Sequence, residues 1–170
     1  MRHVEEFALD AVAYLRANLP TRIAALNAEK DDGLVLAVPA DDGGALGRPE
    51  VAYSLGSESR VSMPWVEVAV PDFDLGEFSL AQYDADFSLS VVVAAMVEEV
   101  VSPHRLTVAM MRWSRVLVET LMQPGAFGDG ETVESVRGAV RAANPETGET
   151  VAVRGGVVLV FTLSSVAVRP

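Results

Sequence analysis

Apolar residues in the N-terminal part of the chain recur every three or four positions. This spacing is the stripe of an amphipathic helix, and it comprises Val4, Phe7, Ala8, Ala11, Val12, Leu15 and Leu19. Pro20 disfavours helical geometry in the residue before it, but proline is well tolerated in the first turn of a new helix. Residues 21–29 continue the pattern with Ile23 and Leu26. The stretch YLRANLPTRIAALNAEK therefore predicts either a second short helix after Pro20 or a kinked continuation of the first.

The next residues, 31–63, have little periodicity and many turn formers, in the strings DDG, ADDGG, GRP and LGSES. A connection of this length is unusual inside a compact domain and is often functional or ordered by a partner. Within it, the string LVLAV at 34–38 is a candidate short strand. We expect the loop to serve contacts between subunits.

Alternating apolar and polar positions predict strands in the rest of the chain. PWVEVAV at 64–70 indicates a short strand, followed by a turn-rich connection, PDFDLGE. Residues 83–93 alternate most regularly. Two more strands, 131–142 and 151–169, are joined by a hairpin-type connection, NPETGE.

The last of these strands carries three further signals. Apolar residues of one parity, which share a face, are Val157, Leu159, Phe161 and Leu163. A parity switch at Ser164 and Ser165 indicates a β-bulge. The paired glycines in RGGVV mark a bend or a close approach of another backbone.

A second helix is predicted between the two pairs of strands. Ser102 and Pro103 form a typical helix start, and Gln123-Pro124-Gly125 ends the helix. Its apolar residues at helical spacing are Leu106, Met110, Trp113, Leu117 and Leu121.

The order of elements predicts an α+β fold with residues 1–170 in a single domain. We expect a roughly four-stranded antiparallel or mixed sheet. The N-terminal helix, kinked at Pro20, and one long central helix would pack on one face of this sheet.

Composition excludes several classes of function. The 170 residues carry a net charge of −11, which argues against wrapping nucleic acid or binding it sequence-specifically. No cysteine is present, so disulfides, thiol catalysis and thiolate metal sites are excluded. No apolar run approaches the ~20 residues of a membrane span. The opening MRHVEEFALD carries two glutamates where a secretory signal has its apolar core, so we expect no export.

The residue types of catalysis do not fall into a known constellation. His3 and His104 lack zinc-site spacing. Asp72, Asp74 and Glu77 superficially resemble a calcium loop, but the full D-x-D-x-D-G pattern with its distant glutamate is missing. Nucleophile elbows and glycine-rich phosphate loops are also missing. We predict no catalytic residue, no cofactor and no metal.

Several stretches together resemble the tail-terminator or neck proteins of long-tailed bacteriophages. They are YLRANLPTRIAALNAE, AYSLG at 52–56, PWVEVAV, a strand of D-x-D-F-x-L-x-V type, the helix MMRWSRVLVETLM and the terminal pair of strands. The resemblance spans most of the chain and rests on the pattern and order of elements.

The resemblance implies a non-enzymatic virion protein that assembles into a ring, commonly a hexamer. Such a ring caps the tail tube, joins it to the head connector, and belongs to the tail or neck of the virion after assembly in the host cytoplasm. Its partners would be the tail tube protein and the head-closure or connector protein. Its sites would be interfaces, for which the candidates are Tyr53, Leu55, Trp65, Arg112 and Arg115.

Three points remain open from the sequence. Arg112 and Arg115 lie on one helix face, where they form either an ion-pair patch between subunits or an ordinary solvated surface. An alternative to the tail terminator is a head-closure or tail-completion protein of the adjacent ring. An alternative from a different class is a small α/β enzyme or ligand-binding domain, which a deep polar pocket with Asp72, Asp84 or His104 would indicate.

Overall fold

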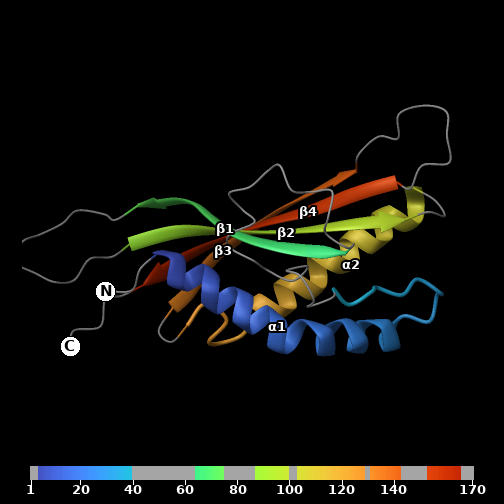
Figure 1. Cartoon of the computed structure of the whole chain (residues 1–170), viewed down its shortest axis with the longest axis horizontal. Coiled ribbons are helices and arrows are strands. Elements are labelled where there is room, and N and C mark those ends of the chain that lie inside the picture. Colours follow the sequence, from blue (N-terminus) through green and yellow to red (C-terminus); the bar gives the residue numbers. More distant parts are fainter. Residues whose placement is uncertain are drawn as a thin grey trace, which may run out of the picture.

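The computed structural model describes residues 4–39, 64–74, 87–99, 103–128, 131–142 and 153–165. Its elements follow in the order α1 (Val4–Glu29), β1 (Trp65–Asp74), β2 (Phe87–Glu99), α2 (Pro103–Leu121), β3 (Glu131–Ala142) and β4 (Val153–Ser165). The strands pair antiparallel in the order β1-β2-β4-β3. Both helices lie on one side of the sheet (Figure 1). The predicted α+β class is confirmed.

The N-terminal helix is one continuous element that contains Pro20. Its axis changes direction along its length (Figure 1), so the kinked continuation is correct and a separate second helix is not. Proline removes one backbone hydrogen bond from a helix interior. The flanking side chains of Leu19, Ile23 and Leu26 are almost fully buried, and this packing stabilises the helix across the interruption.

The predicted apolar stripes of both helices form the core. In α2 the buried stripe includes Leu106, Met110, Trp113, Leu117 and Leu121, each no more than 1% exposed. These side chains pack against the inner face of the sheet, where every second residue of β4 is buried: Val157, Leu159, Phe161 and Leu163. The parity of β4 predicted from the sequence is therefore confirmed.

The glycine pair in β4 marks a close approach of α2. A Cβ atom placed on Gly155 would lie 2.4 Å from Sδ of Met110 and 3.2 Å from Cδ2 of Leu106. Contacts of this length do not occur between real carbon and sulfur atoms, so any larger residue here must displace α2 side chains. Gly155 therefore lets helix and sheet pack directly on each other.

Three predictions about local structure are wrong or fall outside the described residues. Residues 71–74 continue β1 instead of forming a turn, because a bulge between Ala69 and Asp72 accommodates Pro71 on an edge strand. The string at 34–38 has no regular secondary structure, so the predicted short strand is wrong. The predicted bulge near Ser165 cannot be followed beyond that residue, where the described part of β4 ends. Within the described ranges, neither helix has the length and apolar character of a membrane span.

Candidate functional site: a polar clasp on the helical layer

The chain leaves α1 through a tight turn that returns it to the helical layer. The backbone N–H of Lys30 donates to the carbonyl of Leu26 at 3.1 Å. Asp32 then accepts a hydrogen bond from the N–H of Leu34 at 3.2 Å, and Gly33 between them has a φ of 74°. A side-chain-capped turn with a glycine at positive φ is typical of an abrupt change of direction. Residues 31–36, here named the anchored segment, start from this turn.

Side chains alternate along the anchored segment although it belongs to no sheet. Leu34 and Leu36 are buried in the core, whereas Val35 between them is 71% exposed. Asn27, two residues before the end of α1, pairs with the backbone of Leu36. Its Nδ2 donates to the Leu36 carbonyl and its Oδ1 accepts from the Leu36 N–H, both at 2.9 Å. One amide side chain thus satisfies both backbone groups of Leu36, as a neighbouring strand would.

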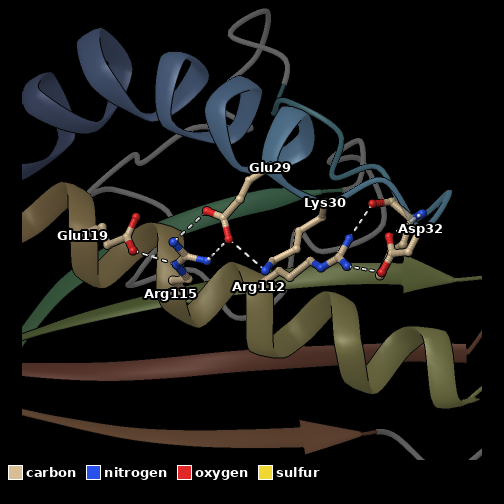
Figure 2. A network of polar contacts seen from close by, with 7 residues as sticks. Glu29, Lys30, Asp32, Arg112, Arg115 and Glu119 are labelled. Carbon is tan, nitrogen blue, oxygen red and sulfur yellow. Dashed lines mark hydrogen bonds and ion pairs between the residues drawn. The ribbon is translucent and has the colours of Figure 1, made fainter.

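Arg112 of α2 bonds the same segment from the second helix (Figure 2). Its Nη1 donates to the carbonyl of Leu34 at 2.6 Å, and its Nη2 pairs with the carboxylate of Asp32. Arg105, two turns earlier on α2, donates to the carbonyl of Gly33 at 3.1 Å. Arg112 is only 8% exposed, and a guanidinium is costly to bury unless its donors are satisfied.

Arg115, one turn along α2, has different surroundings. Its Nη1 and Nη2 donate to the two carboxylate oxygens of Glu29 at 3.0 and 2.9 Å, and its Nε donates to Glu119 at 2.7 Å. Lys30 contacts the same Glu29 carboxylate at 2.8 Å. The four side chains form a chain of charges at the surface (Figure 2), each of them between 42% and 47% exposed.

The charges of this cluster shift one another's pKa. Hydrogen bonds from Arg115, and next from Lys30, lower the pKa of Glu29 to about 2. The hydrogen bond from Arg112, and next that from the Leu34 backbone, lowers the pKa of Asp32. Glu29 and Glu119 in turn raise the pKa of Arg115. We call the whole arrangement the clasp, formed by Asn27, Glu29, Lys30, Asp32, Arg105, Arg112, Arg115 and Glu119.

The side chains of the clasp attach the anchored segment to α1 and α2. Its carboxylates are engaged by arginine and lysine, and it contains no serine, histidine or other nucleophile–base pair. Among the described residues, no group of three histidine, aspartate or glutamate side chains is arranged to hold a metal ion. What the clasp does is fix the position from which the chain continues toward residue 40.

A second polar feature is an open hollow of about 620 Å³ between α1 and the turn that follows α2. It is lined by Asp10, Ala13, Tyr14, Ala17, Asn18, Gly125 and Gly128. Neither Asp72, which lies in β1, nor His104, which is exposed in the first turn of α2, is part of this lining. Asp84 lies outside the described residues.

The structure brings together only two of the predicted interface residues. Arg112 and Arg115 both belong to the clasp, with partners in the same chain, and their use between subunits stays a prediction. Trp65 begins β1, on an edge strand, while Tyr53 and Leu55 lie outside the described residues.

Sequence reasoning missed Asn27, Glu29 and Asp32 as members of the site. The spacing of Arg115 and Glu119, four residues apart on one helix, was a usable signal. No signal in the sequence indicated that residues of α2 pair with Glu29 and Asp32, which are more than seventy residues away in the chain. No protein-family model matches the sequence, and no curated protein matches it.

Proposed function

We propose that this protein is a structural component of a phage virion that forms a ring at the end of the tail tube, as a tail terminator. In this role the sheet and helices form the rigid body of each subunit, and residues 40–63 reach a neighbouring subunit or ring. The tail tube protein and the head connector are its partners, and it performs no chemical reaction. A head-closure or tail-completion ring is the nearest variant of the same proposal.

The observation that supports this role best is the clasp. Arg112 is buried and bonds the anchored segment from α2, and Asn27 bonds the same segment from α1. Contacts of this kind are directional and hold a backbone in one place. A long connection whose first residues are held in this way leaves the helical layer at a defined point, which suits a connection that must meet a neighbour.

The first experiment measures absolute mass by light scattering on the purified chain, alone and with its tail tube protein. We expect a ring-sized species, alone or on the tubes. A chain that stays monomeric and ignores tubes would contradict the proposal and direct attention to ligand screening of the hollow beside Tyr14.

A deletion separates assembly from folding. We expect that replacing residues 41–59 by a short glycine-serine linker leaves the thermal unfolding of the subunit unchanged and weakens assembly on tubes. The matched control is a linker of the original length, which should weaken assembly equally if the native sequence carries the contact. Loss of the folded subunit on deletion would refute an interface role for this segment.

A further inference from the structure

The two faces of the sheet are covered differently in the described part of the chain. On the inner face, under the helices, Val157 and Leu159 are no more than 2% exposed. Their neighbours Val158 and Val160 lie on the outer face and are only partly buried. Figure 1 shows α1 and α2 on the inner side alone. The outer face is therefore the side on which no described helix lies.

Strand register defines which residues share this outer face. In the middle of the two central strands the outer positions are apolar: Val92, Ala94 and Met96 of β2 with Gly156, Val158 and Val160 of β4. Toward both ends they are polar: Ser88, Ser90 and Glu98 of β2 with Arg154, Thr162 and Ser164 of β4. The centre of the outer face is thus a strip of small and medium apolar residues, which in an aqueous environment favours burial against another surface.

The two edges of the outer face have opposite charge. Along β1 the outer positions include Glu67, Asp72 and Asp74 and no basic residue. Along β3 they include Arg137 and Arg141 and no acidic residue between Ser135 and Arg141. Since β1 and β3 are the two edges of the sheet, an apolar strip separates an acidic margin from a basic one.

This charge arrangement complements itself under one two-fold rotation. If a second copy faces the first and the axis runs parallel to the strands, β1 of each copy lies over β3 of the other, and the margins attract. If the axis runs across the strands, β1 lies over β1, and the acidic margins repel. Only the first rotation places an acidic residue near the arginines, because Glu67 then lies between the levels of Arg137 and Arg141. Asp72 and Asp74 lie level with the uncharged Ser135 and Thr132.

We infer that the outer face of the sheet binds a second copy of this chain, face to face, about a two-fold axis parallel to the strands. Register places Glu67 of one copy level with Ala139 of the other. Arg137 and Arg141 lie one pleat to either side of that point. Two sheets packed in this way form a sandwich with nearly aligned strands, an arrangement common in β proteins. The inference does not rest on the proposed ring.

The size of the face sets the strength of the contact. Four strands spaced about 4.8 Å apart, with five or six outer positions about 6.8 Å apart along each strand, give a footprint of roughly 700 Å² per copy. Stable interfaces bury about 800 Å² per partner. We therefore expect a dimer that dissociates on dilution instead of a permanent one.

The test uses the full chain without tail tubes and measures mass by sedimentation across a dilution series. We expect a reversible shift between one chain and two. A chain that is monomeric at every concentration would overturn the inference. A species that is not a dimer and is unaffected by the variants below would overturn it as well. The ring proposal is tested separately on tubes, so the two results are distinguishable.

Ala139 is the most informative position, because it is exposed in the subunit and level with Glu67 of the second copy. A139E places like charges together and should raise the dissociation constant about tenfold, whereas A139K should leave it unchanged or lower it. An axis across the strands, with β3 over β3, would give the opposite order. V140E is the matched control, since Val140 is 44% exposed and lies on the inner side of the same strand.

Reversed charges provide an independent measurement. R137E and E67K should each weaken the dimer, and the double variant should recover most of the lost affinity, because every pair occurs twice about the axis. Thermal unfolding of each variant at high dilution checks that the subunit is intact. If the losses of binding free energy in the two single variants simply add up in the double variant, the face-to-face geometry is wrong.

Discussion

Helix α2 contacts the rest of the molecule in two different ways. Toward β4 it lies so close that Gly155 has no space for a Cβ atom beside Met110. Toward the end of α1 and the anchored segment it adds polar contacts, the hydrogen bonds and ion pairs of Arg112 and Arg115. The first contact depends on shape and the second on charged donors that find acceptors. Close packing therefore fixes α2 on β4, and the polar contacts attach the anchored segment to the helices.

The same comparison can be made within the second contact. Arg112 and Arg115 are one turn apart, and both bond a carboxylate. Arg112 is buried and also bonds a backbone carbonyl, whereas Arg115 bonds only side chains at the surface. Ion pairs at an exposed surface contribute little because water and salt screen them. We therefore expect a graded response, largest at Gly155, smaller at Arg112 and smallest at Arg115.

The largest effect is expected from G155V. Its side chain would overlap Met110 and Leu106, and overpacking of a core costs about 1–3 kcal/mol. G155A should cost less, because the flexible end of Met110 can move aside. Chemical denaturation checks both variants. M110A, made in the G155V background, should cost less than in the native chain, and additive losses would show that the overlap with Met110 is not the cause.

An intermediate effect is expected from R112A. Removing the guanidinium leaves the carbonyl of Leu34 without its charged donor, and we expect a loss at the lower end of the roughly 1.5–3 kcal/mol that such a bond contributes. The pair with Asp32 adds little, because that carboxylate is 52% exposed and screened by water. R112K is the matched control, because a lysine keeps the charge but lacks the planar fork that reaches both acceptors. Hydrogen exchange at Leu34 and Leu36 should rise locally. An unchanged exchange rate would show that Arg112 does not hold the anchored segment.

The difference between the two contacts also explains what the sequence could predict. Helical spacing identified the buried stripe of α2, and the alternation in β4 identified its inner face, because burial imposes a period on apolar residues. The pair of glycines in β4 indicated a close approach, although not which residue would approach. These features are local or periodic, and a single sequence records them.

The clasp left no such record. Its bonds join Asp32 to Arg112 and Glu29 to Arg115, and nothing in the spacing of these residues indicates that they meet. Charged residues near a helix end are equally typical of a solvated surface. The turn predicted after residue 70 was wrong for a related reason, because a bulge in an edge strand accommodates Pro71 and acidic residues. Long-range pairing and irregular strands depend on tertiary context.

The smallest effect is expected from R115A, and pH makes it measurable. The pKa of Glu29 is about 2 in the folded protein against an ordinary value of 4.5. Since the folded pKa is lowered, the contribution of this carboxylate is fully present above pH 4.5 and is lost as the pH falls toward 2. R115A removes the larger cause of the lowered pKa, while Lys30 keeps the smaller one.

The thermal unfolding midpoints of R115A and the native chain should therefore differ little at neutral pH and converge in acid. A carboxyl titration followed by NMR should show the pKa of Glu29 moving up toward 4.5 in the variant. E119A is the matched control, because it removes another partner of Arg115 and leaves the bidentate pair with Glu29 intact. If R115A destabilised the protein as much as R112A, burial would not be what separates the two arginines. The clasp would then act as one cooperative unit, in which the surface pair is as necessary as the buried one.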